Sequence, residues 1–102
     1  MPSLMWSTRR WPNMARLRFA ERVADDAATI WSPRVEAYLR RVLAMLEAFP
    51  EAGSPNVPES IRREFGPNVR KCAVNPYDLV YEYDAEKEEV RVYALINQRM
   101  AT

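Results

Sequence analysis

The last third of the chain carries three short runs of strand-forming residues separated by short links, and this feature constrains the fold most strongly. The runs are VRKCAV (69–74), DLVYEY (78–83) and EVRVYALIN (89–97), and they are enriched in β-branched and aromatic residues. A parallel return between neighbouring strands needs a crossover of about a dozen or more residues, and neither link is that long. We therefore predict that the three runs form an antiparallel meander.

Two amphipathic helices are predicted upstream of this meander. Over residues 20–31, apolar residues recur at three- and four-residue steps with charged residues between them. The pattern restarts at Ser32, which can cap a helix, and at Pro33, which suits the first helical position because the N–H it lacks would be unpaired there. It continues to Phe49, and Pro50 ends it. We expect these two helices to form a tight hairpin.

A short strand and a long loop complete the predicted order of elements. In ARLRF, Leu17 and Phe19 alternate with Arg16 and Arg18, which is the two-residue period of a half-buried edge strand. The segment 50–67 contains four prolines and both glycines, so we expect a loop there. The predicted fold is α+β, in the order β-α-α-β-β-β, with a helical hairpin packed on one face of an antiparallel sheet.

The amino-acid composition excludes several classes of function. A chain of 102 residues forms one domain, and a formal net charge of +1 gives no general attraction to nucleic acid. The absence of histidine excludes imidazole metal sites and histidine-activated nucleophiles. The two glycines are too few for a phosphate-binding loop or a dinucleotide fingerprint. Cys72 is the single cysteine, and we expect it to fill space in a strand and the protein to be cytoplasmic. From the composition as a whole, we expect no membrane span, cofactor or metal.

Residues 1–13, MPSLMWSTRRWPN, show neither a helical nor a strand period and contain no apolar stretch long enough for a signal peptide. Arg9 and Arg10 lie in this segment, and the slight positive charge of the chain depends on them. We expect a flexible N-terminal arm at residues 1–13 and a folded domain at residues 14–102. No chemistry is assigned to the arm.

The sheet face left uncovered by the helices is the candidate binding surface. Strand alternation in the last run predicts four residues toward the helices, namely Val90, Val92, Ala94 and Ile96. It predicts the others on the uncovered face, namely Arg91, Tyr93, Leu95, Asn97 and, if the strand continues, Arg99. Asp78 and Glu82 of the middle strand would face these arginines. Two interpretations of this arrangement are open. The charges form cross-strand pairs that stabilise the sheet, or they line a polar concavity that binds a partner.

The two cations at the start of the first of these strands are expected to point to opposite faces. Strand alternation places Arg70 with Cys72 and Val74, and it places Lys71 with Val69 and Ala73. In a regular strand, therefore, these two side chains cannot both line one site.

Five segments in this order resemble the RelE/ParE family of bacterial toxins from toxin–antitoxin modules. They extend from Met14 to Met100 and are ARLRF, SPRVEAYL, LEAFPEAG, GPNVRKCAVNPYDLVYEYD and VRVYALINQRM. The resemblance implies a growth-inhibiting toxin held inactive by a cognate antitoxin, whose C-terminal segment would wrap over the helices and sheet. It also implies the β-α-α-β-β-β order.

The family contains two activities, because RelE-like members cut messenger RNA on the ribosome and ParE-like members poison DNA gyrase. For a nuclease, the resemblance assigns catalysis to Lys71, Arg70 and Arg99. However, Asp78 stands after Tyr77 where RelE-like members have an arginine, and its carboxylate would repel the phosphate. No tyrosine follows Arg99. We therefore favour gyrase inhibition, with a ribosome-dependent mRNA endonuclease as the alternative and an inactive interaction module as the second alternative.

The expected partners follow from these three hypotheses. All of them include a cognate antitoxin, and the active forms add DNA gyrase or, alternatively, the ribosome with its messenger RNA. The residues expected to contact a partner are Arg70, Arg91, Tyr93 and Arg99. The sequence leaves open whether the protein is an enzyme.

Overall fold

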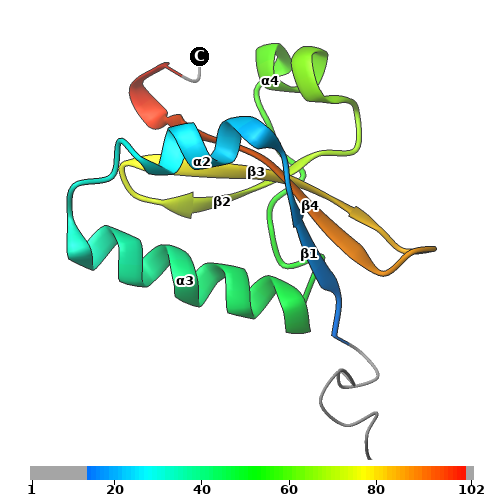
Figure 1. Ribbon diagram of the computed structural model, residues 1–102. Helices are drawn as coiled ribbons and strands as arrows, with labels where there is room; N and C mark the ends of the chain where they lie inside the picture. Colours follow the sequence, from blue (N-terminus) through cyan, green and yellow to red (C-terminus); the bar gives the residue numbers. More distant parts are fainter. Residues whose placement is uncertain (1–13, 101–102) are drawn as a thin grey trace, which may run out of the picture.

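Helices cover both faces of a four-stranded sheet in this computed structural model, which describes residues 14–100 (Figure 1). The predicted arm at residues 1–13 lies outside the described residues. The predicted α+β class is confirmed. In chain order, the elements are β1 (Arg16–Phe19), α2 (Glu21–Ala27), α3 (Pro33–Ala48), α4 (Glu59–Phe65), β2 (Arg70–Val74), β3 (Tyr77–Asp84), β4 (Glu89–Asn97) and the 3-10 turn η1 (Gln98–Met100).

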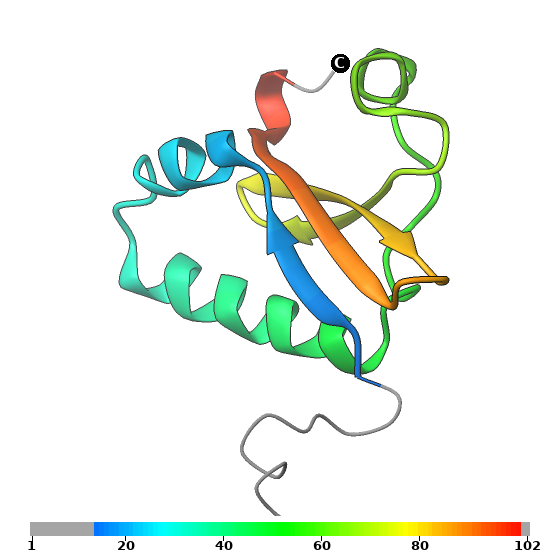
Figure 2. The same ribbon diagram turned by 45° about the vertical axis from the view of Figure 1, so that its right-hand side comes forward.

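The sheet has the strand order β1-β4-β3-β2 and is mixed. β3 pairs antiparallel with β2 and with β4, so the predicted meander is confirmed. β1 runs parallel to β4, with Arg16 opposite Glu89 and Phe19 opposite Val92 (Figure 2). The sequence predicted an antiparallel sheet throughout, but short links constrain only the meander. The chain between β1 and β4 is long enough to return in either direction.

The helices α2 and α3 pack on one face of the sheet and form the larger core. α3 begins as predicted, because Ser32 Oγ accepts a hydrogen bond from the backbone N–H of Val35 at 3.3 Å and Pro33 lies in the first turn. α2 ends at Ala27, earlier than predicted. Among residues 14–100, no helix has the length and apolar character needed to cross a bilayer. The buried residues of this core are Ala15, Val23, Val42, Leu46, Val74, Leu79, Tyr81, Val90, Val92 and Leu95.

The helix α4 covers part of the opposite face, which the sequence predicted to be uncovered. It forms where a loop was expected, because three apolar side chains spaced four residues apart, Val57, Ile61 and Phe65, find partners on the sheet. Val57 and Ile61 pack with Val80, and the ring of Phe65 stacks on Tyr93 with their centroids 5.7 Å apart. The surface available to a partner on this face is therefore smaller than predicted.

An irregularity in β4 changes which residues face the helices. Val80 is opposite Ala94, whereas the next residue of β3, Tyr81, is opposite Val92, so Tyr93 is an extra residue in β4. Beyond this bulge, Leu95 packs in the core beneath α2 and α3, and Ile96 packs against the cluster beneath α4. The predicted alternation is therefore wrong for Leu95, for Ile96 and for Ala94, which pairs with Val80 on the α4 side.

Candidate functional site

Lys71 and Asp78 form an ion pair on the α4 side of the sheet. Lys71 in β2 is paired in register with Val80, and its Nζ lies 3.8 Å from Oδ2 of Asp78. Asp78 is buried, with an exposed fraction of 6 %, and its Oδ1 accepts a hydrogen bond of 3.2 Å from Nε2 of Gln98. The positive charge of Lys71 is therefore opposed by a buried carboxylate, which has two polar partners of its own.

Arg70 lies on the opposite face, as the strand period predicts. It is in register with Tyr81, and its Nη1 donates to the backbone carbonyls of Gly53 at 2.8 Å and Glu51 at 3.1 Å. A guanidinium group that donates to two carbonyls holds the loop after α3 against the sheet. Lys71 and Arg70 are therefore not brought together, and Arg70 has a structural role.

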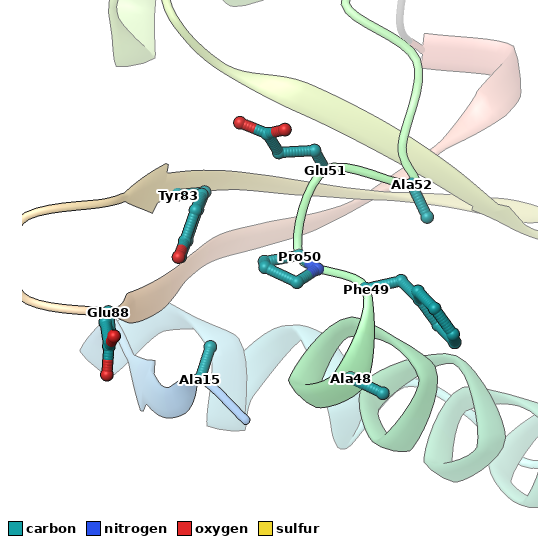
Figure 3. Close-up of a pocket in the computed structure, with 8 residues that line it drawn as sticks. All are labelled: Ala15, Ala48, Phe49, Pro50, Glu51, Ala52, Tyr83 and Glu88. Atoms are coloured by element: carbon teal, nitrogen blue, oxygen red, sulfur yellow. The ribbon is translucent and has the colours of Figure 1, made fainter. Parts of the chain in front are cut away.

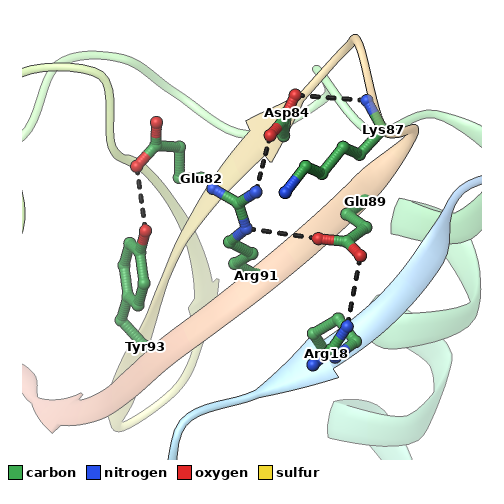
Figure 4. A network of polar contacts seen from close by, with 7 residues as sticks. All are labelled: Arg18, Glu82, Asp84, Lys87, Glu89, Arg91 and Tyr93. Atoms are coloured by element: carbon green, nitrogen blue, oxygen red, sulfur yellow. Dashed lines mark hydrogen bonds and ion pairs between the residues drawn. The ribbon is translucent and has the colours of Figure 1, made fainter.

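Arg91 is the centre of a charge network on the α4 side of the sheet (Figure 4). Its guanidinium pairs with Asp84 and, at 3.3 Å, with Oε1 of Glu89, whose Oε2 lies 3.2 Å from Nη1 of Arg18. The backbone N–H of Lys87 donates to Asp84, and this bond together with the charge of Arg91 lowers the pKa of Asp84. The predicted pairing of Asp78 and Glu82 with Arg91 and Arg99 is therefore wrong, because Arg91 pairs with Asp84 of β3 and with Glu89 of its own strand.

Tyr93 is held by polar and ring contacts within the chain. Its hydroxyl donates to Oε1 of Glu82 at 2.9 Å, and its ring stacks on Phe65. Burial, followed by the bond to Glu82, raises the pKa of Tyr93. The two predicted partner contacts in β4, Arg91 and Tyr93, therefore already contribute to contacts within the fold.

Arg99 differs from the other predicted site residues because its side chain is exposed and has no ion-pair partner among residues 14–100. The strand ends at Asn97, and Arg99 lies in η1, where its backbone N–H donates to Oδ1 of Asn97 at 2.9 Å. The amide of Gln98 donates to Oδ1 of Asn75 at 2.8 Å and to the carbonyl of Tyr77 at 3.3 Å. These bonds fix η1 beside the β2–β3 turn and leave the guanidinium of Arg99 available to a partner.

An apolar groove of 490 Å³ between α2 and α3 is a candidate binding site that the sequence did not predict. Its floor is formed by the sheet residues Leu79, Val92 and Leu95, and Leu39 and Leu43 of α3 line it. Phe19 lines it as well and is 52 % exposed. The helical period predicts that Leu39 and Leu43 lie on the apolar side of α3, but it does not predict that α2 leaves them uncovered. A groove of this kind suits an amphipathic segment of another protein.

A second hollow, of 640 Å³, lies at the end of α3 (Figure 3). None of the predicted site residues lines it. Its lining is mostly apolar and consists of Ala15, Ala48, Phe49, Pro50, Glu51, Ala52, Tyr83 and Glu88. The predicted site residues therefore do not converge on this hollow.

Comparisons with known proteins agree with this architecture. The toxin–antitoxin complex RelBE2 from Mycobacterium tuberculosis contains a chain that superposes with a TM-score of 0.65 at 20 % identity, covering 87 % of this chain and 97 % of that chain. The intact E. coli RelBE toxin–antitoxin complex gives a TM-score of 0.61 at 22 % identity, covering 81 % and 95 % respectively. At these identities the likeness establishes the fold.

The sequence itself identifies the family. No curated protein sequence matches the chain. The family profile that describes the ParE toxin of the type II toxin–antitoxin system parDE matches residues 9–102. This match covers almost the whole chain and confirms the resemblance found in the sequence. The chain belongs to the ParE toxin family of type II toxin–antitoxin systems.

Proposed function

We propose that this protein is a growth-inhibiting toxin that acts by binding DNA gyrase and is neutralised by a cognate antitoxin. The observation that carries the gyrase proposal is the ion pair between Lys71 and the buried Asp78, 3.8 Å apart. A messenger RNA nuclease would need Lys71 to act on the RNA phosphate. In this chain, the charge of Lys71 is paired with the carboxylate of Asp78.

The distribution of the other cations supports the same conclusion. Cleavage by attack of the ribose 2′-oxygen needs a proton acceptor, a proton donor and cations grouped around one phosphate. Arg70 lies on the other face of the sheet from Lys71 and donates to the carbonyls of Glu51 and Gly53. Within residues 14–100, Arg99 alone of the predicted arginines has a guanidinium without an ion-pair partner or a hydrogen-bond partner. One exposed arginine on a fixed turn suits contact with a protein surface better than it suits phosphate chemistry.

The groove between α2 and α3 is the surface that we assign to the antitoxin. Its lining is apolar, and Phe19 remains half exposed at its edge. Burial of exposed apolar side chains favours association by roughly 25 cal/mol per Å² before the entropic costs of binding are subtracted. Both structural relatives belong to toxin–antitoxin complexes, and this supports an antitoxin as the partner.

A supercoiling assay with purified protein and DNA gyrase tests the proposed target. We expect inhibition by the wild-type protein and a loss of inhibition with Arg99→Ala. Arg16→Ala is the matched control, because Arg16 is also exposed and has no ion-pair partner among residues 14–100. Unchanged supercoiling at excess protein would exclude gyrase as the target.

Two further assays separate the alternatives. Primer extension on transcripts after induction reports new cuts within codons, and such cuts together with normal supercoiling would establish the ribosome-dependent endonuclease instead. Growth after induction reports toxicity. We expect growth arrest that co-expression of the cognate antitoxin relieves. Normal growth despite accumulation of folded protein would favour an inactive interaction module.

A further inference from the structure

The exposed side of α3 carries a set of residues that neither the core nor the groove uses. In a helix with 3.6 residues per turn, this exposed side does not adjoin Leu39 and Leu43, which line the groove. The buried Val42 and Leu46 lie between the two sides in one direction around the helix, and Glu36 and Arg40 lie between them in the other. We call this set the outer α3 face. It consists of Arg34, Ala37, Tyr38, Arg41, Ala44, Met45, Ala48 and Phe49, all of them exposed.

The outer α3 face is positively charged and unneutralised. Arg34 and Arg41 have neither an ion-pair nor a hydrogen-bond partner among residues 14–100, and no residue of the face is acidic. Arg40, on another side of the same helix, lies 3.8 Å from Glu36 and is thereby paired. The two free guanidinium groups therefore favour a partner that presents carboxylates.

The same face exposes large apolar side chains in a helical repeat. Tyr38 is 47 % exposed, Met45 37 % and Phe49 66 %. Arg34 and Arg41 are seven residues apart, as are Tyr38 and Met45, and this spacing corresponds to two turns, about 10 Å along the axis. The alanines on the face allow close approach of another backbone. A seven-residue repeat of this kind suits the side-by-side packing of a second helix.

We infer that the outer α3 face docks an acidic amphipathic helix of a partner protein. Carboxylates of that helix pair with Arg34 and Arg41, and its apolar side chains cover Tyr38, Met45 and Phe49. A second copy of this chain fits less well, because it would bring four guanidinium groups together without a counter-charge. Nucleic acid also fits less well, since the face offers only two cations among apolar residues, and affinity for nucleic acid comes from many phosphate contacts.

The probe that tests this inference is a synthetic helix of about fourteen residues, with leucines at heptad positions a and d and glutamates at e and g. Binding to the full chain is followed by the backbone amide NMR signals. We expect shifts of the signals of residues 34–49 that weaken as salt is added. A peptide with lysines in place of the glutamates should bind at least about tenfold more weakly.

A charge exchange on the protein gives the decisive comparison. The double variant Arg34→Glu with Arg41→Glu should lose the acidic peptide and gain the lysine peptide, whereas Arg40→Glu should leave the preference unchanged. Thermal melts followed by circular dichroism check that each variant is folded. Three results would overturn the inference: no binding of the acidic peptide, binding that the double variant does not weaken, or a duplex DNA oligonucleotide that binds this face more tightly than the peptide.

Discussion

The hydroxyl of Tyr81 accepts a hydrogen bond of 2.8 Å from the backbone N–H of Gly53, and this contact joins the loop after α3 to the centre of the sheet. The side chain of Tyr81 is fully buried. A Cβ atom at position 53 would lie 2.6 Å from Cε1 and from the hydroxyl oxygen of Tyr81, and 2.9 Å from the carbonyl of Lys71. Glycine is therefore required at position 53 by close approach.

Gly53→Ala should lower the free energy of unfolding by about 1–3 kcal/mol, because the added methyl group overpacks a site bounded by a buried ring and by backbone. Urea unfolding measures the change. Ala48→Gly, at the exposed end of α3, is a control that alters the same two residue types without a clash. An unchanged midpoint for Gly53→Ala would show that the loop moves away from Tyr81 at no cost.

Stability at high pH should depend on Tyr81, because burial raises its pKa to about 12 from the ordinary value of 10.0. The unfolded chain loses this proton at lower pH than the folded protein does. The stabilisation is therefore complete below about pH 10 and is lost as the pH rises toward about 12. Urea unfolding at several pH values should show a shallower decline for Tyr81→Phe. Tyr38→Phe, on an exposed residue, should decline as the wild type does.

Asp78→Ala should destabilise the fold by about 1–3 kcal/mol, because Lys71 and Gln98 both lose a buried partner. Asp25→Ala removes an exposed carboxylate and should change stability by less than about 0.5 kcal/mol. Chemical denaturation of both variants measures the difference. Equal stabilities would mean that the contacts of Asp78 contribute nothing to the fold.

Arg70→Ala and Arg99→Ala should change different properties of the protein, the first its stability and the second its toxicity. Loss of Arg70 removes two hydrogen bonds to the loop after α3, so we expect a lower melting temperature. Loss of Arg99 should leave the melting temperature unchanged and reduce growth inhibition by on the order of tenfold, if this side chain is an anchor of the target contact. Melting curves and dose–response growth assays separate the two effects. Wild-type toxicity of Arg99→Ala would remove this residue from the site.

Phe19→Glu should weaken neutralisation by the antitoxin, because it places a charge in the apolar groove between α2 and α3. We expect growth arrest to persist while co-expressed antitoxin rescues poorly, with affinity reduced by on the order of tenfold. Trp31→Glu is the control, since Trp31 is 91 % exposed and lies outside the groove. Equal rescue of both variants would place the antitoxin elsewhere.

The parts of the fold that the sequence predicted correctly are those set by local signals. The start of α3 follows from the cap at Ser32 and from Pro33, and the meander follows from links too short for a crossover. α4 and the bulge at Tyr93 depend on packing between distant segments. Ile61 and Phe65 are spaced by one turn of α4 and Val57 lies just before the helix, but whether these side chains stabilise the helix depends on the sheet surface that they meet. No local pattern reveals that surface.

The candidate site was predictable to the same extent. The opposite directions of Arg70 and Lys71 follow from the strand period, and the structure agrees. That Arg70 binds the carbonyls of the loop after α3 depends on the path of that loop, which the sequence does not specify. The groove between α2 and α3 depends likewise on how the two helices diverge.

Val80 and Tyr81 are adjacent in β3, yet one belongs to the cluster beneath α4 and the other to the core beneath α2 and α3. Both side chains are fully buried, so β3 contributes one face to each of two separate hydrophobic interiors. Loss of β3 from the sheet would therefore expose both interiors at once. Heating should therefore melt the domain in one step, with fluorescence and circular dichroism reporting the same midpoint.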